Sequence, residues 1–136
     1  MMTEEVQKLK ILIVDDDAFL LDMYAMKFTE SGYEVLSAVS GENALELLRD
    51  NGGEVSFALI DLVMPEMDGF TLLEQANQEG LHQQTKFIVL SNLSQESDIE
   101  RAKQLHAIDY IVKANYTPQE VVDRVRETIS KHNSTA

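Results

Sequence analysis

Five short apolar runs constrain the fold most, because each is followed by a segment in which apolar residues keep helical spacing. The runs read "LKILIVD", "YEVLSA", "FALID", "KFIVLS" and "DYIVK". Most are apolar almost without interruption, which is typical of strands buried on both faces of a parallel sheet. Strands and helices that alternate in this way predict an α/β fold, with a parallel sheet covered on both faces by helices. The 136 residues fit one domain and show no internal repeat.

Capping residues place the helices between these runs. The predicted helix starts are Asp17, Ser40, Asp68, Ser94 and Thr117. The last start is the strongest, since "TPQE" offers a threonine N-cap, a proline at the first helical position and a glutamate at the third. We expect residues 1–8 to be a disordered lead-in, 9–130 the folded domain and 131–136 a polar tail. On the first helix, Leu21 and Met26 are predicted to face outward.

Composition narrows the possible partners. The chain holds 24 acidic against 11 basic residues and no cysteine. A net charge of -13 repels nucleic acid and anionic membranes and favours cations or a basic partner. No apolar run approaches the ~18 residues of a membrane span, and the N-terminus lacks the features of a signal peptide. We therefore predict a cytoplasmic protein that binds neither DNA directly nor a membrane.

Reactive side chains follow four of the five predicted strands. In doubly wound folds the site lies at the carboxyl ends of the strands. The residues found there are Asp15, Asp16, Asp17, Asp61, Ser91 and Lys113. Taken alone, Asp61, Ser91 and Lys113 each have a structural explanation, and Asp17 is expected to cap the first helix. Asp15 and Asp16 are harder to explain in this way, because three consecutive acids repel one another. Their convergence on one edge of the sheet nevertheless predicts a functional site.

Oxygen ligands without histidine or cysteine neighbours favour magnesium over zinc. We expect Asp16 and Asp61 to coordinate Mg²⁺ directly, Asp15 to act through water, and the backbone carbonyl of Val63 to complete the protein ligands. A carboxylate beside Mg²⁺ can act as a nucleophile toward phosphorus and form an aspartyl phosphate. Lys113 would neutralise charge on the phosphoryl group, starting about 10 Å from Asp61 at two sheet spacings, most of which an extended lysine covers.

The segments "ILIVDDD", "ALIDLVMPEMDGF", "IVLS" and "DYIVK" resemble, in order and spacing, the receiver domain of bacterial two-component response regulators. The resemblance covers residues 9–130. It implies a single doubly wound (βα)5 flavodoxin-like domain with strand order 2-1-3-4-5. It implies a signalling module with self-phosphorylation and slow autodephosphorylation rather than a metabolic enzyme.

The same resemblance implies roles for individual residues. Asp61 would accept phosphate from a sensor histidine kinase or phosphotransfer protein, with Mg²⁺ at Asp15, Asp16 and Asp61. Ser91 would then move toward the phosphoryl group, where its hydroxyl could hydrogen-bond a phosphoryl oxygen, and Tyr110 would change rotamer. These movements would alter the surface of the fourth helix, fifth strand and fifth helix. That surface would bind an output protein or a C-terminal effector domain that this chain lacks.

Three positions depart from the family pattern. Asn92 stands where a small residue is usual, His106 where glycine is usual, and Ala114 where a proline in a cis bond usually follows the lysine. A cis bond before a residue other than proline costs ~2.5–4 kcal/mol. We therefore predict a left-handed His106, a trans bond before Ala114, and a shifted loop after Lys113.

Two other functions fit parts of the pattern. A degenerate receiver would bind a partner without phosphorylation, and only Asn92 and Ala114 favour it. A phosphatase of the haloacid dehalogenase type also uses an aspartate nucleophile, Mg²⁺, a strand-end hydroxyl and a lysine. That family places its nucleophile after the first strand and a further acid pair after the lysine, which this sequence lacks.

Overall fold

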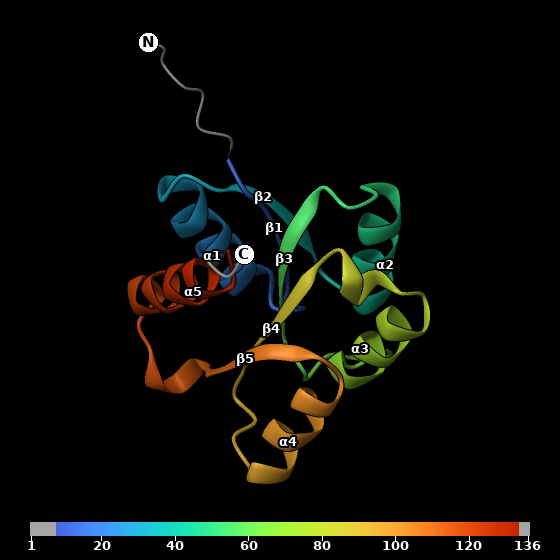
Figure 1. The fold of residues 1–136 in the computed structure, drawn as a ribbon. Helices are drawn as coiled ribbons and strands as arrows, with labels where there is room; N and C mark the ends of the chain where they lie inside the picture. Colours follow the sequence, from blue (N-terminus) through green and yellow to red (C-terminus); the bar gives the residue numbers. More distant parts are fainter. Residues whose placement is uncertain (1–7, 134–136) are drawn as a thin grey trace.

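The computed structural model describes residues 8–133, within which five strands form one parallel sheet in the order β2-β1-β3-β4-β5 (Figure 1). The strands are β1 (Lys10–Val14), β2 (Glu34–Ala38), β3 (Val55–Ile60), β4 (Lys86–Ser91) and β5 (Ala107–Val112). The helices are α1 (Ala18–Glu30), α2 (Gly41–Asp50), α3 (Gly69–Gln78), α4 (Glu96–Gln104) and α5 (Pro118–Asn133), with short 3₁₀ helices η1 (Leu81–Gln83) and η2 (Lys113–Asn115). The predicted (βα)5 fold and strand order are confirmed. None of the helices in residues 8–133 is both long and apolar enough to cross a membrane.

The helices form two layers, one on each face of the sheet. Figure 1 shows α1 and α5 side by side on one face, and α2, α3 and α4 on the other. Along β1 the side chains alternate between these layers, so Ile11 and Ile13 pack toward α1 and α5 while Leu12 and Val14 pack toward α2 and α3. All four are almost fully buried. This two-sided burial explains why the strands read as continuous apolar runs.

Four of the five predicted helix caps are confirmed. The side chains of Asp17, Ser40 and Asp68 accept hydrogen bonds from backbone N–H groups in the first turns of α1, α2 and α3. Before α5, Thr117 and Glu120 each accept a bond from the other's backbone N–H, as the capping box predicts. The prediction that Ser94 starts the fourth helix is wrong. The helix begins at Glu96, and its N-cap, Gln95, makes no side-chain capping bond.

One further prediction about the helices needs correction. Leu21 is only 3% exposed and packs in the layer of α1 and α5, so it does not face outward, whereas Met26 is 59% exposed. At the other end of the chain α5 continues to Asn133, and the division into a folded domain and a polar tail stays a prediction. The lead-in prediction concerns residues that lie, apart from Lys8, outside the described range.

The unusual backbone positions behave as predicted. His106 has φ 72°, in the left-handed region, and its ring stacks on that of His82 with 4.6 Å between ring centroids. The peptide bond before Ala114 is trans. Ala114 lies in η2, which also contains Lys113, so the lysine follows β5 instead of ending it. That this loop is shifted relative to the family stays a prediction.

An ion pair ties β5 to α5 and supplies a prediction about stability. Arg124 donates hydrogen bonds to both carboxylate oxygens of Asp109, at 2.9 and 2.7 Å, and Thr128 donates a third at 2.7 Å. Burial opposes the charge of Asp109, but these donors outweigh it, so the pKa of Asp109 lies below its usual value. Asp109→Asn should therefore lower the free energy of unfolding by about 1–3 kcal/mol at neutral pH.

The pH dependence of this loss checks its cause. A lowered folded-state pKa contributes stability that is fully present above the unfolded pKa of about 3.9 and is lost as the pH falls through the folded pKa. Urea unfolding should thus show a difference between the wild type and Asp109→Asn that is constant at neutral pH and shrinks below about pH 4. Asp123→Asn, on the exposed face of α5, is the matched control and should change little. A difference that grows toward low pH would contradict the ion-pair explanation.

Candidate functional site

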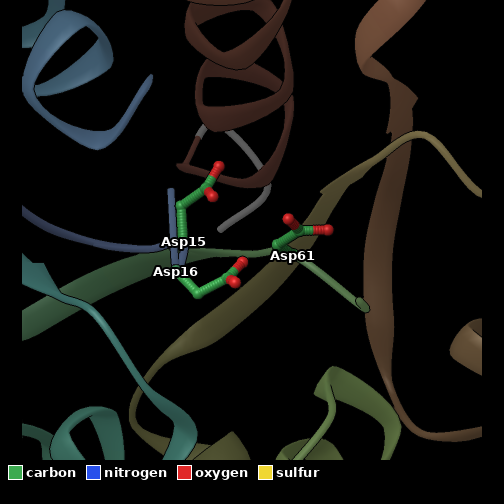
Figure 2. A group of neighbouring side chains, drawn as sticks. All are labelled: Asp15, Asp16 and Asp61. Atoms are coloured by element: carbon green, nitrogen blue, oxygen red, sulfur yellow. The ribbon is translucent and has the colours of Figure 1, made fainter. Parts of the chain in front are cut away.

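Three carboxylates meet where β1 and β3 end (Figure 2). Val14 and Ile60, the last residues of the two strands, are paired in the sheet, so Asp15 and Asp61 leave it side by side. Asp16 follows directly. One carboxylate oxygen from each of the three acids lies within 4.8 Å of the others. The predicted convergence of these acids on one edge of the sheet is therefore observed.

The backbone fixes the two buried members of this cluster. Asp15 and Asp61 are 2% and 7% exposed, and their N–H groups donate to the carbonyls of Ala38 and Val14. Asp15 Oδ1 accepts a bond from the N–H of Asp17 at 2.9 Å. Asp61 Oδ1 accepts one from the N–H of Val63 at 3.2 Å. In both aspartates Oδ1 is thus held by a backbone N–H of the loop that follows the strand, and Oδ2 is left for another partner.

Lys113 donates hydrogen bonds to the Oδ2 atoms of both Asp15 and Asp61. Its Nζ lies 2.6 Å from Asp15 Oδ2 and 3.1 Å from Asp61 Oδ2, and its side chain is 8% exposed. The sequence prediction that the lysine covers only most of the distance was too cautious, since it bridges the whole gap. Burial opposes the charge of Lys113, but the hydrogen bond to Asp15 and the charge of Asp61 outweigh it and raise the pKa of the lysine. Lys113 is therefore a permanent cation at neutral pH.

One ammonium group does not balance three carboxylates. Burial raises the pKa of Asp15, and the hydrogen bond from Lys113 offsets this only in part. Asp16, in contrast, is exposed to solvent. An excess of negative charge on oxygen donors, open to solvent on one side, is the chemistry that suits a hard divalent cation. The residues therefore fit Mg²⁺.

Ser91 and Tyr110 meet at the segment that follows β4. Ser91 is fully buried, and its hydroxyl accepts a bond from the N–H of Leu93 at 3.4 Å. The Tyr110 hydroxyl donates to the Leu93 carbonyl at 2.6 Å. Burial, followed by the charges of Asp98 and Asp61, raises the pKa of Tyr110 to about 12. The tyrosine is thus a neutral hydrogen-bond donor that links β5 to the loop after Ser91.

The site opens to solvent through a pocket of about 340 Å³. Its lining residues are Asp15, Asp16, Asp17, Leu20, Asp61, Val63, Asn92 and Lys113. Sequence reasoning missed Leu20, a residue of α1 that is partly buried against the core on that side of the sheet. It also missed that Asn92 accepts a hydrogen bond from Ala114, at 2.9 Å, which no local pattern announces.

Gly69 packs against the phosphoacceptor candidate and supplies a second stability prediction. A Cβ atom at this position would lie 2.4 Å from the Asp61 carbonyl oxygen and 2.7 Å from Leu62 Cα, both backbone atoms. Gly69→Ala should therefore force the start of α3 away from β3 and lower the free energy of unfolding by about 2–3 kcal/mol. The melting temperature should fall by about 5–10 °C.

Gly41→Ala is the matched control for this substitution. Gly41 is also the first residue of a helix, but the atoms nearest to a Cβ placed there belong to the flexible side chain of Met67, which can move aside. Thermal melts should place Gly69→Ala well below Gly41→Ala. Equal melting temperatures would show that the backbone behind Asp61 yields as easily as a side chain.

Comparison with known proteins agrees with this geometry. Residues 11–126 match the family model of the response regulator receiver domain. The chain is 33% identical over 125 residues to "Probable transcriptional regulator ycf27" of Porphyridium aerugineum, and 31% identical over 121 residues to "Response regulator SaeR" of Staphylococcus aureus. These alignments cover 92% and 89% of the chain but 50% of each relative, so the chain spans about half the length of these curated relatives.

Solved structures show the same fold. A CheY-like receiver domain protein of Methanospirillum hungatei superposes with a TM-score of 0.84 at 26% identity, covering 96% of this chain and 100% of that one. CheY from a CheX–CheY–BeF3–Mg complex of Borrelia burgdorferi superposes with a TM-score of 0.79 at 27% identity, covering 89% of each chain. Sequence, sheet topology and acidic cluster agree, and the chain belongs to the response regulator receiver domain family.

Proposed function

We propose that this chain is a phosphoacceptor switch in which Asp61 takes a phosphoryl group from a phosphohistidine on a sensor histidine kinase or phosphotransfer protein. The observation that carries the proposal is the position of Lys113 Nζ between Asp15 and Asp61, beside an acidic cluster that is open to solvent. A cation already in place opposite the nucleophile favours transfer of a negatively charged group.

In the proposed reaction a carboxylate oxygen of Asp61 attacks phosphorus. A P–O bond forms, the P–N bond of the donor phosphohistidine breaks, and the donor imidazole keeps the electron pair. Lys113, already hydrogen-bonded to Asp61, neutralises charge on the transferred group. Val63 N–H, bonded to Asp61 Oδ1, holds the carboxylate in a fixed orientation.

Mg²⁺, when bound, would neutralise charge shared between the carboxylates and the phosphoryl oxygens. Asp16 and Asp61 would coordinate it directly, Asp15 through water, and Val63 through its carbonyl. The similar structure of a CheX–CheY complex from Borrelia burgdorferi contains Mg together with BeF3, which supports the use of Mg²⁺ by such a site.

Phosphorylation would act on the loop after Ser91, to which Tyr110 is hydrogen-bonded. Because Tyr110 is bonded to Leu93, a movement of Ser91 toward the phosphoryl group would be transmitted to β5. The surface formed by α4, β5 and α5 would then change its affinity for an output partner. Since the matched relatives are about twice as long as this alignment, that partner is either a separate protein or an effector domain joined to this one.

Intact mass measurement tests the proposal. The wild type, incubated with acetyl phosphate and Mg²⁺, should gain about 80 Da, the mass of one phosphoryl group. Excess EDTA in place of Mg²⁺ should suppress the gain. A folded protein that shows no adduct would contradict the proposal and favour a receiver that binds its partner without phosphorylation. Rapid, continuous turnover of phosphate esters would instead indicate a phosphatase.

A further inference from the structure

Asn92 is the one side-chain amide among the residues that line the pocket of the acidic cluster, and its orientation is fixed by a neighbour. The backbone N–H of Ala114 donates a hydrogen bond of 2.9 Å to Asn92 Oδ1. The N–H group is a donor only, so the atom that faces it must be the amide oxygen and not the nitrogen. The Ala114 bond therefore determines which way the amide of Asn92 is turned.

This orientation leaves Asn92 Nδ2, with two N–H donors, as the polar atom that remains available. Asn92 lines the same pocket as Asp61 and Lys113. A phosphoryl group on Asp61 has three terminal oxygens, and Mg²⁺ and Lys113 would neutralise two of them. The third needs a donor from the end of β4. There the Ser91 hydroxyl is fully buried in the resting structure and would move toward the group, while Asn92 is already exposed and borders the pocket, so its amide adds a second donor.

We propose that Asn92 is a phosphoryl-binding residue, which donates from Nδ2 to a terminal oxygen of the group on Asp61 and is oriented for this by the Ala114 N–H. Ala114 is then a positioning residue, acting through Asn92. The two residues lie 22 positions apart in the chain but act together. Without the N–H donor of residue 114, the side-chain amide of residue 92 would turn freely. This inference rests on the proposed function.

Beryllofluoride, BeF3⁻, is the probe, because its three fluorines stand for the three terminal phosphoryl oxygens. In ¹⁵N–¹H spectra of the wild type, the Nδ2 protons of Asn92, assigned by their disappearance in Asn92→Ala, should shift and exchange slowly once BeF3⁻ and Mg²⁺ are added. Asn92→Ala should bind BeF3⁻ about tenfold more weakly, as expected for the loss of a hydrogen bond to a charged group.

Ala114→Pro removes the N–H donor and tests the orientation. It should weaken BeF3⁻ binding in the wild-type background and have no further effect on Asn92→Ala, because the amide it orients is then absent. Asn115→Ala is the matched control. Asn115 lies in the same η2 turn but outside the lining of this pocket, and its substitution should leave the affinity unchanged.

The outcomes separate this inference from the proposed function. If the wild type binds BeF3⁻ while the Nδ2 resonances stay in place and Asn92→Ala keeps full affinity, Asn92 only ties two loops together and the inference is wrong. If the wild type binds no BeF3⁻ at all, the proposed function fails, and the inference fails with it. The Nδ2 measurement uses the wild type, so it decides the question even if Ala114→Pro does not fold.

Discussion

Asp61→Asn is expected to abolish the mass gain of about 80 Da that acetyl phosphate and Mg²⁺ give to the wild type. A carboxamide has no anionic oxygen to attack phosphorus, so the loss should be complete rather than partial. The substitution preserves the shape of the side chain and keeps an oxygen that can accept a bond from Val63 N–H or Lys113. The variant should therefore remain folded, which circular dichroism and thermal melting can verify.

Asp68→Asn is the matched control for this experiment. Asp68 is an exposed aspartate in the same loop, where it caps α3 by accepting a bond from Thr71 N–H at 2.8 Å. Asparagine is an equally good N-cap, so this variant should accept the phosphoryl group as the wild type does. An adduct that persists in Asp61→Asn would place the acceptor on another residue, and Asp16 would be the first to examine.

The residues at the carboxyl edge of the sheet could be predicted from the sequence, because each strand is recognisable from its own apolar run. A buried parallel strand reads as a continuous apolar run, and the polar residue after it necessarily lies at the carboxyl edge of the sheet. Asp15, Asp61 and Lys113 could thus be placed together without knowing any contact. The capping residues were predictable for the same reason, since a cap bonds to residues only two or three positions away.

Features that depend on distant segments could not be predicted in this way. Leu21 was predicted to face outward, but it lies in the buried cluster of the layer in which α1 contacts α5. The start of α4 was misplaced because that helix has a single fully buried residue, Ala102, and therefore no clear apolar stripe. The bond from Ala114 to Asn92 joins two loops, and the sequence showed only that both positions were unusual.

How far the Lys113 side chain reaches also depends on the tertiary structure and could not be predicted from the sequence. Sheet spacing gave the separation of the strands, but the 3₁₀ turn that contains Lys113 decides where its side chain begins. The lysine bonds to Asp15 and Asp61 at once, so the resting site contains a counter-charge before any phosphoryl group arrives. The pocket is thus organised around this one cation, which makes its removal informative.

Lys113→Met should lower the free energy of unfolding by about 3 kcal/mol when Mg²⁺ is removed with EDTA. Methionine fills a similar volume but leaves the buried carboxylates of Asp15 and Asp61 facing one another without their cation. At the proposed Mg²⁺ site, added Mg²⁺ should stabilise the variant more than the wild type, whose lysine already supplies part of the counter-charge. Urea unfolding with EDTA and with millimolar Mg²⁺ measures both effects.

Lys86→Met removes the same charge from an exposed position at the start of β4 and separates this local effect from the change in net charge. In a chain of net charge -13, any lost cation increases repulsion, and the control variant reports how much of the destabilisation that repulsion causes. We expect Lys86→Met to unfold nearly as the wild type does, with the same gain from Mg²⁺. If Lys113→Met matched it in both conditions, the ion pairs at the sheet edge would contribute nothing to the resting fold, and Lys113 would act only once a phosphoryl group is present.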